Sequence, residues 1–351
     1  MRHCPCATAT TNSAIARTGT PLFPMEIKMT KRFSCLAGWL ALLLPAFALA
    51  APGDDFPARR ITLVVPFPAG SATDGTARRL AVELARLAGQ PVIVDNKPGA
   101  DGNLAALAVL RAEADGHTVF ITTNSTHAAN VNLFKSLPFD PRADFAPVTG
   151  IVKIPMLLAV RAESPVKNMA EYLALAKKST PPLTFGSASQ AGRGAGELMK
   201  ARAGLSILNV PYKGAPQGLT DLVGGHIDSY FADPVSAAGL IQKGAVRVLA
   251  ITSARRALSM PEVPTFDESG FPGFEMIAWI GAFVPEKTPR VAVLKLNAML
   301  TAILADPQMV ASFTNNGAAP FPTTPEQLGE FAETDTKRWA QIVEAAKMVK
   351  Q

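Results

Sequence analysis

The sequence predicts an α/β fold of two domains, with mainly parallel sheets and flanking helices. Short apolar runs alternate with longer amphipathic segments along most of the chain, an order typical of βαβ units. Roughly 300 residues follow the N-terminal region, which is more than one average domain contains. Two proline-rich stretches, 136–155 and 253–289, interrupt the alternation and indicate two crossings between domains. We therefore expect domain 1 over 51–155 plus 277–351, with domain 2 (156–276) inserted.

The first 50 residues predict an N-terminal extension and an export signal. Three basic residues between positions 28 and 32 precede an apolar run over 33–51, which contains the small-x-small site Ala48-Leu49-Ala50. These features together are typical of a secretory signal peptide. We expect cleavage after Ala50 and a periplasmic mature protein, rather than an uncleaved membrane anchor. The start is left open among Met1, Met25 and Met29.

The composition of the remaining chain excludes several function classes. Cys4, Cys6 and Cys35 all precede the expected cut, so the mature protein would form no disulfide. Five of the 34 Lys and Arg residues and one of the 28 Asp and Glu residues also precede it, which leaves the rest close to neutral. Without basic runs, no nucleic-acid partner is expected.

The apolar runs and amphipathic segments predict eight strands and nine helices. The expected strands are 61–65, 92–94, 118–122, 156–160, 183–186, 207–210, 228–231 and 246–252. The expected helices are 72–88, 103–113, 127–134, 168–178, 192–203, 216–223, 234–242, 290–304 and 325–349. The last helix has the clearest start, because Thr324-Pro325-Glu326-Gln327 combines an N-cap, a proline at the first position and a capping-box Gln.

The segment Ile61–Arg79 carries the strongest functional signal. A buried strand ends in a Pro/Gly turn over 66–70, and Ser71 and Asp74 then have the spacing of a helix capping box. The helix after it is amphipathic, and Gly89 ends it. Such a turn directs unpaired backbone N–H groups and the positive helix end at one point, which creates an anion site without any charged side chain.

The same order of strand, small polar turn and helix occurs three more times. The later turns are 122–127 (TTNSTH), 186–192 (GSASQAG) and 231–234 (FADP), where Asn124, Ser125 and Asp233 are suitable N-caps. An ordinary cap explains any one copy. Because carboxyl-end turns of parallel α/β sheets line the ligand crevice, two turns from each expected domain favour a shared cleft.

No motif in the chain predicts catalysis. The sequence lacks a Gly-x-Ser-x-Gly elbow, a Walker loop, a His-Glu-x-x-His pair and a Cys-x-x-Cys pair. His117 and His226 fall in expected turns, His117 is interpreted as a surface residue, and no histidines have metal-ligand spacing. The rival hypothesis is an exported hydrolase or lyase, for which Ser187, Ser125 and His127 are the candidates. We expect no catalytic residue, metal or cofactor.

Six motifs, taken in order, carry a resemblance that covers residues 55–349. They are VPFPAGSATDGTARRLA, VDNKPGADGN, DGHTVFITTNSTHAAN, LPFDPRADFAPVT, VPYKGAPQGLTDLVGGHID and MPEVPTFDESGFPGFE. With these motifs the chain resembles the Bug-type extracytoplasmic solute receptors, the substrate-binding proteins of tripartite tricarboxylate transporters. Ser71 and Asp101 depart from the pattern, because many members have glycine at those positions.

The resemblance implies a two-domain Venus-flytrap fold that closes on a small carboxylate or amino acid, held mainly by main-chain amides and water. The ligand-binding residues that it implies are Phe67, Pro68, Ala69, Gly70, Ser71, Thr73 and Asp74 of the first turn, Asn124, Ser125 and His127 of the second, Gly186, Ser187, Ala188 and Ser189 of the third, and Asp233. It also implies a monomer whose partners are the integral membrane subunits of a tripartite transporter.

Three of these residues have two interpretations each. Asp74 and Asp233 are suited to cap a helix, and each is also suited to accept a ligand amine or water. Phe67 is suited either to the core or to the apolar wall of a pocket. We expect a receptor that delivers a dicarboxylate, tricarboxylate, aromatic carboxylate or amino acid to its transporter. The alternative is a receptor that senses a ligand for a membrane signalling partner.

Overall fold

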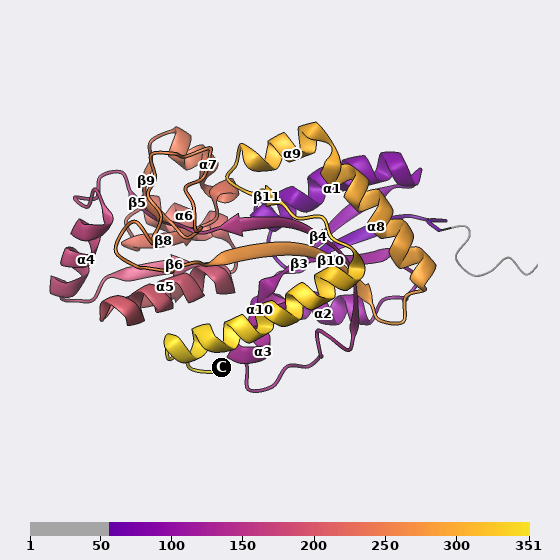
Figure 1. Cartoon of the computed structure of the whole chain (residues 1–351), viewed down its shortest axis with the longest axis horizontal. Helices are drawn as coiled ribbons and strands as arrows, with labels where there is room; N and C mark the ends of the chain where they lie inside the picture. Colours follow the sequence, from indigo (N-terminus) through magenta and orange to yellow (C-terminus); the bar gives the residue numbers. More distant parts are fainter. Residues whose placement is uncertain (1–55) are drawn as a thin grey trace, which may run out of the picture. The chain divides into compact units, whose positions relative to one another are not determined.

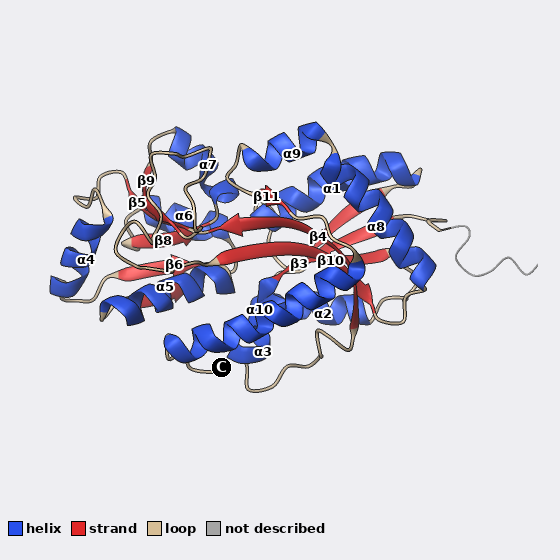
Figure 2. Ribbon diagram, in the orientation of Figure 1, coloured by secondary structure: helices blue, strands red, loops and turns tan. Residues whose placement is uncertain are grey.

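The computed structural model describes residues 56–351, so the expected signal peptide and its cleavage site lie outside the described residues (Figure 1). Strands and helices alternate along this part of the chain and form two separate sheets (Figure 2). Within 56–351, every helix is too short or too polar to cross a bilayer. We name the elements around the first sheet the first lobe and those around the second sheet the second lobe.

The first sheet has six strands in the order β11-β4-β10-β3-β1-β2. Its strands are β1 (Ile61–Val65), β2 (Val92–Asn96), β3 (Thr118–Thr123), β4 (Phe145–Pro155), β10 (Ile277–Pro285) and β11 (Ala319–Pro320). The helices around it are α1 (Ala72–Ala88), α2 (Asn103–Leu110), α3 (Asn130–Leu133), α8 (Arg290–Ala305), α9 (Pro307–Thr314) and α10 (Pro325–Ala345), with the short turns η1 (Ala100–Gly102) and η2 (Ser125–Ala129).

The second sheet has five strands in the order β7-β6-β8-β5-β9. Its strands are β5 (Leu157–Arg161), β6 (Thr184–Ser187), β7 (Leu208–Pro211), β8 (Ser229–Ala232) and β9 (Val246–Ile251). Its helices are α4 (Met169–Lys178), α5 (Gln190–Ala203), α6 (Ala215–Val223) and α7 (Pro234–Gln242). Most bounds agree with those expected from periodicity and caps; α1, for example, covers 72–88 as predicted.

The expectation of mainly parallel sheets needs a correction, because both sheets are mixed. β1 pairs in parallel with β2 and β3, and β6 with β7 and β8. The pairs made by β4, β5 and β10 are antiparallel. β4 and β10 lie in the proline-rich stretches that interrupted the predicted alternation, and Pro147 and Pro155 lie within β4 itself. Proline is depleted in strands, so its presence hid these two long strands.

The chain passes between the sheets at Met156 and Met276, and Thr252 ties these two crossings together. The Thr252 hydroxyl accepts from the Met156 backbone N–H at 2.7 Å and donates to the Met276 carbonyl at 2.5 Å. The Thr252 backbone N–H donates to the Met156 carbonyl, and the Thr252 carbonyl accepts from the Met276 N–H. Thr252 is fully buried, so these hydrogen bonds are shielded from water and hold the two crossings next to each other.

The C-terminal helix α10 is anchored across the first lobe (Figure 1). It begins with the predicted capping box, in which Thr324 and Gln327 exchange hydrogen bonds. The Trp279 indole N–H of β10 donates to Asp335 at 2.8 Å, and the Asn132 amide donates to the Thr336 carbonyl at 2.9 Å. These contacts fix α10 against the sheet and against α3.

The interpretation of His117 as a surface residue is wrong. Its side chain is buried, and its Nε2 accepts a hydrogen bond from the Ala58 N–H at 3.2 Å. The ring also meets Phe56 edge-on, with centroids 4.9 Å apart. Phe56 and Ala58 pack on the turn that holds His117. Because they are far from His117 in the sequence, the residues next to His117 do not predict its burial.

Candidate functional site

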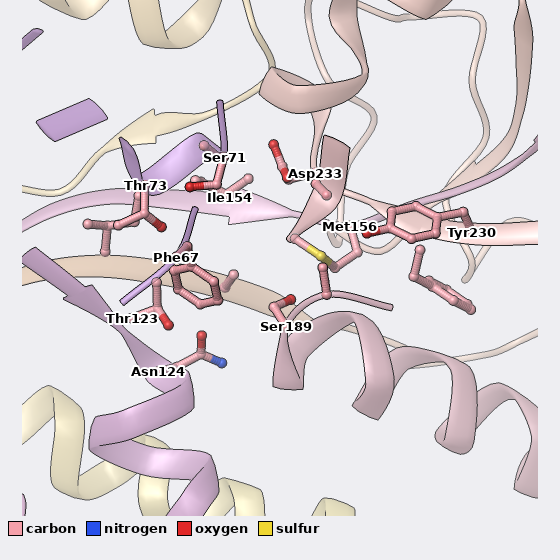
Figure 3. A pocket seen from close by; sticks show the side chains of 16 residues that line it. Phe67, Ser71, Thr73, Thr123, Asn124, Ile154, Met156, Ser189, Tyr230 and Asp233 are labelled. Atoms are coloured by element: carbon pink, nitrogen blue, oxygen red, sulfur yellow. The ribbon is translucent and has the colours of Figure 1, made fainter. Parts of the chain in front are cut away.

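A narrow cleft lies between the lobes, and it is lined by the turns that the sequence singled out together with the crossing strands (Figure 3). The lining residues are Phe67, Ser71, Ala72, Thr73, Thr123, Asn124, Ile154, Met156, Ala188, Ser189, Ala215, Tyr230, Phe231, Asp233, Ala278 and Ile280. Its volume is about 50 Å³, which is room for only a few water molecules. An organic ligand therefore requires the lobes to move apart or the lining side chains to rearrange.

Seven of the fifteen predicted site residues line this cleft. They are Phe67, Ser71, Thr73, Asn124, Ala188, Ser189 and Asp233. The eight predicted residues that do not line it are Pro68, Ala69, Gly70, Asp74, Ser125, His127, Gly186 and Ser187. Two of these side chains bond to other parts of the protein instead. The Ser187 hydroxyl accepts from the Asn209 amide at 2.8 Å, and the Ser125 hydroxyl accepts from the Gln190 N–H at 3.3 Å.

The first-lobe end of the cleft is a set of hydrogen-bond donors at the start of α1. Ser71 is the N-cap, and its hydroxyl accepts from the Asp74 N–H at 3.2 Å. The next two residues, Ala72 and Thr73, line the cleft, and within 56–351 their backbone N–H groups have no partner. Two free amides at the positive end of a 17-residue helix provide a site for an anion.

The Asp74 side chain stabilises the turn that precedes α1. Its carboxylate accepts from the Gly70 N–H at 2.9 Å, from the Asn96 amide at 2.9 Å and from the Arg78 guanidinium at 3.0 Å. Burial by itself would raise the pKa of Asp74, but the hydrogen bonds from Arg78, Gly70 and Asn96 outweigh it and lower the pKa. These contacts support the structural interpretation of Asp74, as the residue that positions the donors of α1.

Asp74→Asn is expected to lower the free energy of unfolding at pH 7 by about 1.5–3 kcal/mol, the usual contribution of a hydrogen bond to a charged group. A carboxylate whose pKa is lowered in the folded state stabilises the protein above its unfolded pKa and loses that effect as the pH falls through the folded value. The deficit of the variant should therefore shrink below the ordinary Asp pKa of 3.8. Urea unfolding at pH 7 and pH 3 measures both values, and a deficit that is equal at the two pH values would contradict this role.

Asn124 does not act as the helix cap that the sequence predicted. Its backbone is already helical, with φ −51° and ψ −21°, and its side chain makes no capping bond. The side chain is fully buried, lines the cleft, and has no partner for its amide nitrogen or its amide oxygen. Since buried amides normally find partners, this free amide points to a group that enters the cleft.

The second-lobe end of the cleft presents hydroxyl groups and one acid. Asp233 caps α7 as expected, through a bond from the Ser236 N–H at 2.7 Å. Ser189 caps α5 through a bond from the Gly192 N–H at 3.2 Å, so this helix begins two residues before the expected start at 192. The Tyr230 hydroxyl is buried without a partner in the described chain. Desolvation raises the pKa of Asp233 in spite of its hydrogen bonds from Ser236. None of the lining side chains is a Lys or an Arg.

The apolar walls of the cleft are the part that sequence reasoning missed. Ile154 and Met156 lie at the first crossing, and Ala278 and Ile280 belong to β10. Met156 begins the expected strand 156–160, and the other three lie in the proline-rich stretches. Neither signal separates a core residue from a cleft residue. Phe67 also faces the cleft, which supports the interpretation as a pocket wall (Figure 3).

The two lobes touch at residues outside the cleft lining. The Gln190 amide donates to the Asn130 side-chain oxygen at 3.3 Å. Gly214 lies against Pro68, so closely that a Cβ on Gly214 would stand 2.3 Å from the proline Cγ. With about 50 Å³ of free space between them, the lobes are in a nearly closed arrangement.

The candidates for a hydrolase are not organised as a catalytic set. In the described chain, His127 Nδ1 contacts the Thr126 hydroxyl at 2.9 Å, and neither Ser125 nor Ser187 bonds to the imidazole. Burial lowers the pKa of His127 to about 3, so its ring is neutral. A general base must reach the nucleophile that it activates, and this geometry provides no such pair.

Comparison with known proteins places the chain in a family. Residues 76–348 match the model of the tripartite tricarboxylate transporter family receptor. Among solved structures, Rpa4515 of R. palustris with adipate is 33% identical with a TM-score of 0.81, covering 85% of this chain and 100% of its own. MatC of Rhodopseudomonas palustris with bound malate is 34% identical (TM-score 0.78; 82% and 100%), and the periplasmic binding protein BugD is 31% identical (0.79; 84% and 100%). The chain thus has the fold of periplasmic binding proteins and belongs to the Bug-type receptors of the tripartite tricarboxylate transporter family.

Proposed function

We propose that this protein captures a small carboxylate in the cleft and delivers it, in the periplasm, to the membrane subunits of a tripartite transporter. The observation that carries the proposal is the group of free donors at the first-lobe end: the Ala72 and Thr73 amides and the Asn124 side chain. Backbone donors at a helix start bind a carboxylate without a basic side chain. The adipate and malate bound to the similar proteins Rpa4515 and MatC support this choice of ligand class.

Capture proceeds by closure of the two domains, which we place at 51–155 plus 277–351 and at 156–276. A ligand that touches both ends of the cleft stabilises the closed form, because only that form completes its hydrogen bonds. The chain changes sheet at Met156 and Met276, which supports these bounds. The Thr252 bonds join these two crossings and therefore lie at the hinge of such a closure.

The part of the ligand that meets Asp233 carries a hydrogen-bond donor. No basic residue in the lining offsets the acid there, so a ligand carboxylate beside Asp233 is unfavourable unless a donor lies between the two. An ammonium or a hydroxyl group pairs with Asp233, while Tyr230 and Ser189 offer further hydroxyls. Among four-carbon acids, this favours aspartate or malate over succinate.

Thermal unfolding with a panel of acids tests the proposal. The panel contains succinate, malate and aspartate, which differ only at one carbon, together with adipate, citrate and benzoate. A true ligand at 100 times its dissociation constant is expected to add about 2.7 kcal/mol of stability. If no member of the panel stabilises the protein, carboxylate capture is wrong; if succinate binds best, only the role given to Asp233 is wrong. Chemical analysis of the bound ligand after incubation separates capture from turnover.

A further inference from the structure

Two residues of opposite charge, Asp101 and Arg193, come from opposite lobes and have no other charged partner. Asp101 lies in η1 of the first lobe and is exposed, whereas Arg193 lies in α5 of the second lobe and is half-buried. Neither side chain makes a hydrogen bond or an ion pair with the rest of the described chain. Both charges are therefore available to each other.

A short chain of hydrogen bonds between the lobes brings these two residues near each other. The Asn130 amide donates to the Asp101 carbonyl at 3.1 Å, and the Asn130 side-chain oxygen accepts from the Gln190 amide at 3.3 Å. Gln190 and Arg193 are three residues apart in α5, so their side chains lie on the same face of that helix. Asn130 thus joins the backbone of Asp101 to the helix face that carries Arg193.

The charge of Arg193 acts on the Asp101 carboxylate in this arrangement. Desolvation raises the pKa of Asp101, and the positive charge of Arg193 opposes that increase. Coulomb interactions in a solvated protein weaken quickly with distance, so this effect agrees with a guanidinium that lies near the carboxylate without touching it. Neither residue lines the cleft, so neither is placed to pair with a ligand there.

The backbone of η1 gives Asp101 a defined position. Ala100 and Asp101 both have a left-handed conformation, with φ 47° and 51°, between Gly99 and Gly102, whose φ values are also positive. This conformation is unfavourable for a residue with a Cβ, and such residues cluster where a side chain has a function. Gly102 packs so closely that a Cβ there would stand 2.6 Å from the methyl carbon of Thr126, which fixes the turn.

We propose that Asp101 and Arg193 form an ion pair between the lobes when the protein closes fully on its ligand, and that this pair stabilises the closed form. The inference rests on the closure proposed above. The lobes are already nearly closed, so a small further approach brings the two charges into contact. Because the pair does not touch the ligand, it raises the affinity for every cleft ligand alike, by the roughly 1.5- to 5-fold expected of an exposed ion pair.

A double-mutant cycle measures the coupling between the two charges. Asp101→Asn removes one charge and keeps a residue that tolerates the left-handed conformation, and Arg193→Gln removes the other. The control cycle is Arg142→Gln with Glu333→Gln, an ion pair of 3.6 Å that lies within the first lobe. Calorimetric titration with the tightest acid of the panel gives the affinities at low and high salt, and circular dichroism verifies that each variant is folded.

Each substitution at Asp101 or Arg193 is expected to weaken binding roughly 1.5- to 5-fold at low salt, and the double variant should lose no more than either one. High salt should bring the affinities of wild type and variants together, because it screens exposed charges. The control variants should bind like wild type. Losses that multiply in the double variant, or a loss with Arg193→Gln alone, would overturn the inference.

Chemical cross-linking tests the approach of the two residues even if no acid of the panel binds. Asp101→Cys combined with Arg193→Cys is treated with a short bis-maleimide in the mature protein, whose natural cysteines all precede the expected cut. Asp101→Cys with Ala201→Cys is the control, because Ala201 is exposed about 12 Å further along α5. Only the first pair should cross-link, and faster with ligand present. Cross-linking without any binding acid would contradict carboxylate capture alone, whereas binding without cross-linking would contradict the ion pair alone.

Discussion

Gly214→Ala is expected to weaken the binding of every cleft ligand, because it holds the two lobes apart. Gly214 has φ −165° and needs no special backbone conformation, so alanine is tolerated locally. Its Cβ would stand 2.3 Å from Cγ and 2.9 Å from Cδ of Pro68 in the opposite lobe. A rigid proline ring does not move aside, and overpacking of this kind costs about 1–3 kcal/mol. This corresponds to a loss of roughly 5- to 150-fold in affinity.

The best control for this change is Gly239→Ala in α7 of the same lobe. A Cβ at Gly239 meets nothing within 4 Å, and alanine inside a helix is favourable, so affinity should not change. Calorimetric titration with the tightest acid of the panel gives the affinities, and small-angle X-ray scattering gives the radius of gyration. Gly214→Ala should remain more expanded than wild type when ligand is added. Wild-type affinity in this variant would show that the Gly214–Pro68 contact plays no part in closure.

Asn124→Leu is expected to reduce affinity by roughly 10- to 150-fold without destabilising the free protein. The buried amide of Asn124 has no partner in the described chain, so its removal breaks no hydrogen bond of the protein itself. A ligand that bonds to this amide loses a hydrogen bond that contributes about 1.5–3 kcal/mol when the partner is charged. The melting temperature of the free protein should stay the same or rise, because an unpaired polar group is replaced by an apolar one of similar size.

Asn130→Leu, only six residues further along the chain, provides the contrast. Asn130 is equally buried, but its amide donates to the Asn103 side chain at 2.8 Å and to the Asp101 carbonyl at 3.1 Å. This variant should lose about 1–3 kcal/mol of stability, because those bonds and their partners are disrupted. Thermal unfolding separates the two results. Equal destabilisation by both substitutions would mean that the Asn124 amide is satisfied within the protein and is not reserved for ligand.

Much of the local structure was predictable because it depends on neighbouring residues. The start and end of α1 follow from the Ser71 cap and from Gly89, which adopts the left-handed conformation with φ 63°. The capping box at Thr324 and the cap at Asp233 are likewise local hydrogen bonds. The long strands β4 and β10 were missed, because their pairing joins residues more than a hundred positions apart and outweighs the local effect of proline.

By itself, the sequence determined the α/β character of this protein, the four turns and the donor-rich start of α1, because each depends on periodicity and hydrogen bonds within a few residues. Only the tertiary structure decided which side chains meet across the lobes. Packing between distant segments left the Asn124 amide free in the cleft, buried His127 in an aromatic wall, and built the cleft walls from Met156 and Ile280. Such outcomes depend on volumes and partners contributed by both sheets, and no local pattern of residues contains them.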